Sequence, residues 1–135
     1  MISKELLVGY QATCYTILNP KIDIYLDKEN HELQTFLIEQ NFHSWCFITA
    51  WNPFSRALIL DENTSLNKKL EADLNNYIVF PAEGKDTLGD WPPEISFFVA
   101  NISKEQAIFL GKKYEQNAIV YGEINSPATL LLLVE

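Results

Sequence analysis

The stretch from Trp45 to Ser55, WCFITAWNPFS, constrains the fold of this chain more than any other segment. Its first part, up to Trp51, is rich in aromatic and β-branched residues, which favour an extended strand. Apolar side chains occupy both alternating faces of this run, as is typical of a strand in the middle of a sheet. The strand cannot continue past Pro53, because proline has no N–H for the sheet ladder and the neighbouring Asn52 favours a turn. We therefore predict a buried central strand that ends in a polar loop.

Periodicity along the rest of the chain predicts alternating helices and strands. Ahead of the central strand we expect a helix, two short strands and a second helix, over residues 3–14, 15–18, 22–26 and 30–40. From the central strand onward the order is β-α-β-β-α-β plus one strand, over residues 45–51, 61–75, 77–81, 95–100, a helix opened by Ser103, 118–122 and 130–134. Glu83 to Pro93 reads as a loop.

This order is that of the ferredoxin-like fold, in which the first and third strands lie in the middle of the sheet. The two most apolar strands, 45–51 and 95–100, occupy those two places in the sequence. We therefore predict an α+β fold with a ferredoxin-like core at about residues 45–123 and a mostly antiparallel sheet. An N-terminal αβα elaboration and an extra C-terminal strand would complete it. The length of 135 residues predicts a single domain over 1–135.

The charge balance limits the partners that we expect. Lys and Arg number 10 against 18 Asp and Glu, a net charge of −8, which disfavours binding to nucleic acid and to anionic membranes. No signal peptide develops after Met1, so we expect a cytoplasmic protein. The longest apolar run, Leu130 to Val134, is too short to span a membrane. It is either covered within the monomer or used in an interface, which leaves open a protein-interaction or self-association module, such as a homodimer, as the alternative function.

The predicted topology brings separate polar segments to one end of the sheet. The first two strands of the core end there, and the third and fourth begin there. We predict at this end a site for a small molecule or a short peptide, in which amides read the ligand and a tryptophan stacks on it. Its expected members are Trp51, Asn52, Ser55, Arg56, Trp91, Glu94, Gln116 and Asn117.

The same residues also have structural explanations. Asn52 and Ser55 are common in turns, and Gln116-Asn117 follows the last helix, where asparagine is a common terminating residue. The carboxylates of the expected loop could bind a divalent ion or act as acid and base, but a solvated acidic loop is the commoner arrangement. These carboxylates are Glu83, Asp86, Asp90 and Glu94.

Cofactor and nucleophile chemistry have little support in the sequence. There is no Walker A motif and no G-x-G-x-x-G motif, so nucleotide binding through those motifs is not supported, and the sequence leaves the cofactor unknown. The two cysteines, Cys14 and Cys46, form no CxxC pair, and we expect buried thiols and no metal site made of cysteine and histidine. The topology places His43 at the end of the sheet away from Ser55, and His31 lies on a helix. We therefore expect no hydrolase that depends on cysteine, serine or histidine.

Three segments of the chain are distinctive in combination: Phe47–Ser55, Trp91–Phe97 and Gly111–Val120. Together they resemble the domain-of-unknown-function family 3293, and the resemblance extends over about residues 10–122. Glu62-Asn63 and Asn67 fit the same pattern, whereas Leu60 departs from it, since a small polar helix cap is expected there. The resemblance implies no particular activity. It places the most distinctive residues at the same end of the sheet.

Overall fold

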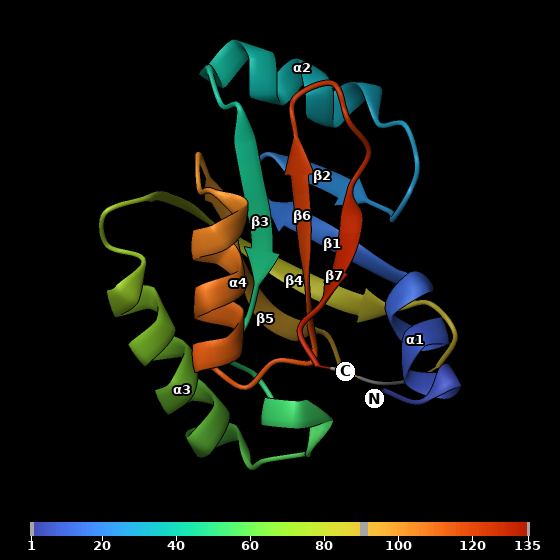
Figure 1. The fold of residues 1–135 in the computed structure, drawn as a ribbon, viewed down its shortest axis with the longest axis vertical. Coiled ribbons are helices and arrows are strands. Elements are labelled where there is room, and N and C mark those ends of the chain that lie inside the picture. The colour runs from blue at the N-terminus through green and yellow to red at the C-terminus, as the bar shows by residue number, and fades with distance from the viewer. Residues whose placement is uncertain (1, 90–91, 135) are drawn as a thin grey trace.

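The computed structural model describes residues 2–89 and 92–134 and, over these ranges, contains four α-helices, one 3-10 helix and a seven-stranded sheet (Figure 1). The helices are α1 (Lys4–Gln11), α2 (His31–Gln40), η1 (Pro53–Ser55), α3 (Leu60–Asp73) and α4 (Lys104–Lys113). The strands are β1 (Thr13–Leu18), β2 (Lys21–Ile24), β3 (Ser44–Ile48), β4 (Ile78–Asp86), β5 (Glu94–Ala100), β6 (Ala118–Glu123) and β7 (Thr129–Leu132).

The strand order is β2-β1-β4-β5-β3-β6-β7, and every neighbouring pair is antiparallel. The predicted adjacency of the two most apolar strands is confirmed, since Trp45 lies opposite Ala100 and Phe47 opposite Phe98. The predicted C-terminal strand is confirmed as β7, which pairs with β6. The mixed α/β fold with an antiparallel sheet is therefore as expected.

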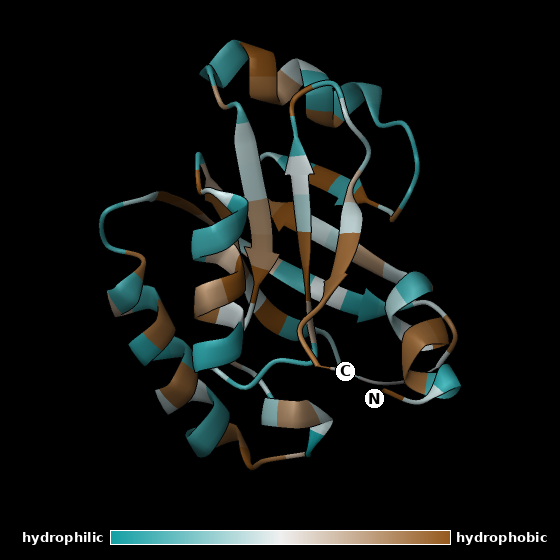
Figure 2. Cartoon of the chain, viewed as in Figure 1, coloured by the Kyte–Doolittle hydropathy of each residue, from teal (hydrophilic) through white to brown (hydrophobic). Residues whose placement is uncertain are grey.

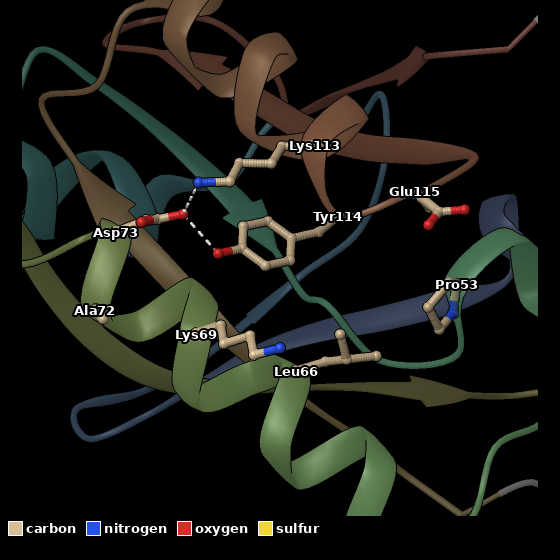
Figure 3. A pocket seen from close by; sticks show the side chains of 8 residues that line it. All are labelled: Pro53, Leu66, Lys69, Ala72, Asp73, Lys113, Tyr114 and Glu115. Atoms are coloured by element: carbon tan, nitrogen blue, oxygen red, sulfur yellow. Dashed lines mark hydrogen bonds and ion pairs between the residues drawn. The ribbon is translucent and has the colours of Figure 1, made fainter.

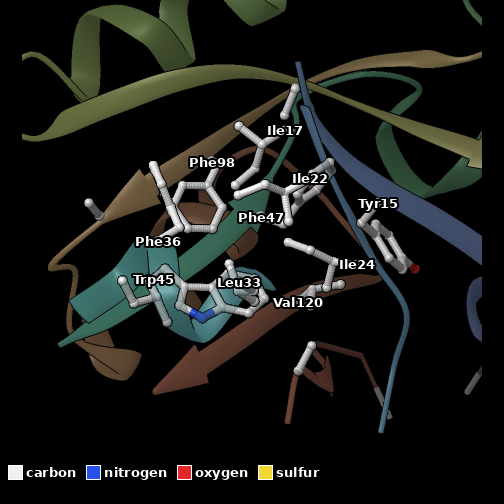
Figure 4. Packing of buried hydrophobic residues seen from close by; sticks show 14 of the residues in the cluster. Tyr15, Ile17, Ile22, Ile24, Leu33, Phe36, Trp45, Phe47, Phe98 and Val120 are labelled. Atoms are coloured by element: carbon white, nitrogen blue, oxygen red, sulfur yellow. The ribbon is translucent and has the colours of Figure 1, made fainter. Parts of the chain in front are cut away.

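The sheet curls around a core of apolar side chains. Strands β1 to β6 and helix α2 all contribute side chains to this inner core (Figure 4). Both edges of the sheet reach it, because Ile22 of β2 is a member and Leu130 of β7 packs against it. A backbone bond of 2.8 Å from Asp27 N to Ala128 O joins the two edges. In Figure 1 the direction of the strands changes accordingly: β1 and β4 run across the picture, whereas β3 and β6 run vertically.

A second core lies between the outer face of the sheet and the helices α3 and α4. Cys46 and Ile48 of β3 point into it, together with Leu70 and Leu74 of α3 and Leu110 of α4. The two helices alternate hydrophilic and hydrophobic residues (Figure 2), so that one side of each meets the sheet. The predicted two-faced burial of the central strand is thus confirmed.

Trp45 shows how tightly the inner core is packed. The indole is fully buried and stacks on Phe98, with ring centroids 5.2 Å apart. A Cβ at Gly122 on the neighbouring strand would meet indole atoms at 2.4–2.5 Å, so glycine is required beside this ring.

Two helix starts follow the predicted capping. Asn30 Oδ1 accepts a hydrogen bond from Leu33 N at 3.0 Å, and Ser103 Oγ accepts one from Gln106 N at 3.1 Å. The start of α3 differs, because Ile59 is the N-cap residue and provides no side-chain bond. This uncapped start is the structural counterpart of the departure noted at Leu60.

Three predicted boundaries are wrong by three residues or more. The first helix ends at Gln11 rather than at Cys14, because Thr13 to Ile17 pairs with β4 and most of that run pairs with β2 as well. The central strand ends at Ile48 rather than at Trp51. The expected loop from Glu83 does not begin there, since β4 continues to Asp86 with β1 beside it all the way. In the first and third cases pairing with distant strands decided the boundary, whereas beyond β3 the backbone bonds to α3, with Ala50 N donating to Asn67 Oδ1.

The apolar C-terminal run is largely covered by the chain itself. Leu130 packs against the inner core, and Leu131 and Leu133 pack against the outer one, while Leu132 is 50% exposed. Across the described residues, none of the helices combines the length and the apolar character needed to cross a membrane.

Candidate functional site

Asparagines of α3 hold the loop that follows β3. Asn67 Oδ1 accepts a hydrogen bond from Ala50 N at 2.8 Å, and Asn63 Oδ1 accepts one from Asn52 N at 2.8 Å. Both α3 side chains are nearly inaccessible, with 2% exposure for Asn63 and 6% for Asn67. Buried amides of this kind are kept because they satisfy backbone groups that would otherwise be unpaired.

The backbone of this loop is strained. Asn52, Phe54 and Ser55 have φ values of 47°, 51° and 60°, in the left-handed region that non-glycine residues seldom adopt. Asn52 Oδ1 fixes the turn by accepting bonds from Leu58 N at 3.0 Å and Asn63 Nδ2 at 2.8 Å. Strain of this kind persists only where the surroundings enforce it, and it concentrates at functional sites.

Five side chains meet beside this loop, and we call them the polar cluster: Tyr10, Asn52, Ser55, Glu94 and Asn117. Asn117 Nδ2 donates to Ser55 Oγ at 2.9 Å. Tyr10 reaches the same place from α1. Burial raises its pKa, hydrogen bonding to Ser55 and Asn117 lowers it in part, and the charge of Glu94 raises it further. The cluster therefore joins α1, the loop after β3, the start of β5 and the residue before β6.

Glu94 lies on the inner face of the curled sheet. It is opposite Gly84 of β4, which is in turn opposite Tyr15 of β1, so these three residues share one row and one face. Burial raises the pKa of the Glu94 carboxyl, and a hydrogen bond from the Asn52 side chain lowers it by less. The negative charge of Glu94 also raises the pKa of Tyr15, after the larger effect of burial.

Four predicted site residues come together in the polar cluster: Asn52, Ser55, Glu94 and Asn117. Gln116 does not join them, because its amide donates to the backbone carbonyls of Trp51 at 3.3 Å and Tyr114 at 3.2 Å. It is a buried structural residue.

The other predicted site residues are less tied to the cluster. Trp51 is half-buried and follows the end of β3. Arg56 is exposed, and its backbone N–H donates to Pro53 O at 3.1 Å. Trp91 lies outside the described residues.

Sequence reasoning missed Tyr10, and it left Asn63 and Asn67 without a role. Tyr10 belongs to a helix far away in sequence, and a bond of 2.9 Å from Tyr15 Oη to Tyr10 O ties that helix to β1. A signal for the two asparagines exists, since they are polar residues four apart on the side of α3 that also buries Leu70.

The predicted convergence of carboxylates is wrong for Glu83. It neighbours Gly84 on β4 and therefore points to the face opposite that of Glu94. Asp86 belongs to β4 and accepts a bond from Leu88 N at 2.8 Å. Asp90 lies outside the described residues. No three His, Cys, Asp or Glu side chains gather as potential metal ligands within the part of the chain that the structure describes.

The cysteines are buried and free, as predicted. Burial raises the pKa of Cys46, which disfavours the reactive thiolate. His43 bonds through its backbone N–H to Asn101 Oδ1 beyond the far end of β5. The candidate site therefore owes its chemistry to a carboxyl, hydroxyls and amides.

A hollow of about 420 Å³ lies elsewhere, between α3 and the end of α4 (Figure 3). Within it, Asp73 accepts bonds from Lys113 Nζ at 2.7 Å and from Tyr114 Oη at 2.5 Å. These two bonds lower the pKa of Asp73, whereas burial and Asp73 raise the pKa of Tyr114 to about 12. The polar groups of this hollow satisfy one another and join the two helices.

The fold and the site define an α/β protein with a curled antiparallel sheet and a polar cluster at one end of it. The chain belongs to the family described as protein of unknown function (DUF3293), whose family model matches residues 48–119. The match begins at the end of β3 and ends in β6, so it includes four members of the polar cluster and leaves out Tyr10. Comparisons with curated proteins and with solved structures gave no match.

Proposed function

We propose that this chain is a binding module for a small molecule or a short peptide, and that the polar cluster is its site. The convergence of side chains from four separate segments beside a strained loop supports the proposal most. Ligand sites commonly combine a few convergent polar groups with an open end of a curled sheet.

Access to solvent separates four of the five cluster residues from a purely structural network, since Asn117 is the one buried member. Ser55 is exposed, and Tyr10, Asn52 and Glu94 are partly exposed. In contrast, the buried amides of Asn63 and Asn67 are used up by backbone and loop groups. Solvent-facing hydroxyls and a carboxyl retain hydrogen-bonding capacity that a ligand can use.

We also propose that β3, α3, β4, β5, α4 and β6 form a ferredoxin-like unit within a single domain. The strand order β4-β5-β3-β6 with antiparallel neighbours supports it. In this arrangement the loop after β3 and the start of β5 are side by side, which is the basis of the site.

The test is a thermal-shift screen of metabolites, amino acids, short peptides and nucleotides, followed by affinity measurements on variants. A true ligand at a hundred times its Kd should stabilise the protein by about 2.7 kcal/mol. Tyr10→Phe and Ser55→Ala each remove one hydroxyl, and each should weaken binding about 3- to 10-fold, the usual effect of one neutral hydrogen bond. Tyr77→Phe is the matched control, since Tyr77 is also half-buried but precedes β4 at the opposite end of the sheet.

Equal affinity of all three variants for every hit would place the binding site elsewhere. The complete lack of a stabilising ligand would count against a binding function. Circular dichroism of each variant checks that the fold is retained.

A further inference from the structure

We infer that the polar cluster recognises its ligand through a cationic nitrogen, a primary ammonium group, which Glu94 accepts. The inference rests on the proposed binding function and specifies its ligand class.

Glu94 lacks a cationic partner among the described residues. The one ion pair over these ranges joins Lys113 to Asp73 at 2.7 Å, in the hollow between α3 and α4. Glu94 is half-buried on the inner face of the sheet, in the same cross-strand row as Gly84 and Tyr15. A carboxylate that loses water in such a place is normally matched by a positive charge.

The side-chain amide of Asn52 fills only some of the hydrogen-bond acceptor sites of the Glu94 carboxylate. Asn52 Oδ1 is occupied by Leu58 N and Asn63 Nδ2, so its remaining group, Nδ2, is the one that can face Glu94. A carboxylate can accept about four hydrogen bonds. Glu94 therefore retains acceptor sites that a ligand with several N–H groups can fill.

The hydroxyls of the cluster suit the same ligand group. Asn117 Nδ2 donates to Ser55 Oγ, and a hydroxyl oxygen still has a second lone pair. Tyr10 adds another hydroxyl from α1. An ammonium group has three donors and no acceptor, so one carboxylate and one or two hydroxyl oxygens match it.

Charge also discriminates against the opposite ligand class. A ligand carboxylate beside Glu94 would be repelled by its like charge. The net charge of −8 favours the approach of cations to the whole molecule.

The test compares three probes that share an aromatic body: phenethylamine, 2-phenylethanol and 3-phenylpropionate. Calorimetric titration of the full chain at pH 7 and constant ionic strength should show the amine binding at least tenfold more tightly than the alcohol, with the acid weakest. Glu94→Gln keeps the size of the side chain and removes the charge, and it should reduce the amine preference to twofold or less. Glu83→Gln is the matched control, because Glu83 lies on the opposite face of the sheet, and it should keep the preference.

The inference is overturned if the alcohol binds as tightly as the amine, or if Glu94→Gln keeps the amine preference. If the alcohol or the acid binds and Tyr10→Phe weakens it, the proposed function stands and the ammonium assignment alone fails. If no probe and no member of the wider screen responds to Tyr10→Phe, both fail. Glu94→Asp retains the charge, and it should keep an amine preference, so it serves in case the glutamine variant does not fold.

Discussion

At the scale of single residues, Glu94 is a half-buried carboxyl without a cationic partner among the described residues. Burial raises the pKa of its carboxyl, and the neighbouring titratable groups, Tyr10 from α1 and Tyr15 from β1, carry no positive charge to offset it. A group kept ready for a ligand in this way should lower the stability of the empty protein.

We predict that Glu94 lowers the free energy of unfolding in a pH-dependent way. Between the ordinary pKa of a glutamate and the raised pKa of Glu94, the folded chain holds a proton that the unfolded chain has lost. Stability of the natural chain therefore falls as pH rises through that window, by about 1.4 kcal/mol for each pKa unit. Glu94→Gln should lack this fall and be the more stable form at pH 7. Urea unfolding from pH 4 to pH 8 measures this fall in stability. Parallel curves of stability against pH for the natural chain and for Glu94→Gln would contradict the prediction.

At the scale of elements, α3 has two roles. Leu70 and Leu74 pack it on the sheet, while Asn63 and Asn67 hold the loop that carries Asn52. Helix and loop thus form one unit, and the strained backbone of the loop depends on the helix.

Asn63→Ala tests this dependence. The change would leave Asn52 N without its acceptor and would remove one of the two hydrogen bonds that Asn52 Oδ1 accepts. We therefore expect a loss of about 1–3 kcal/mol in the free energy of unfolding. Asn75→Ala, an exposed asparagine just after α3, should change it by about 0.5 kcal/mol or less. Denaturant unfolding of both variants gives the comparison, and similar losses for the two would show that the asparagine bonds of α3 do not hold the loop.

Elements with strong local signals could be predicted from sequence, and those set by distant pairing could not. The central strand, its neighbour β5 and the caps at Asn30 and Ser103 all follow from local residue patterns. The length of β4 does not, because it depends on β1 alongside it.

The same division applies to the site. Asn52, Ser55, Glu94 and Asn117 could be expected together because they flank strands of the core. Tyr10 could not, since the position of α1 follows from the pairing of β1 with β4 and from the bond of Tyr15 to Tyr10.

At the scale of the whole molecule, the curled sheet gives its inner core two different ends. Leu33, Phe36 and Leu37 of α2 close one end. The short helix η1 and α1 lie toward the other end, at the bottom of the view in Figure 1. The polar cluster occupies this second end, which is where we propose that the ligand binds.

The most direct test of the polar cluster as a ligand site is an NMR titration of the isotope-labelled chain with the tightest ligand from the screen. We predict that the largest shifts fall on the side-chain amides of Asn52 and Asn117, the carboxyl carbon of Glu94 and the ring of Tyr10. Shifts concentrated instead on Lys69, Asp73 and Lys113, which line the hollow between α3 and α4, would contradict it.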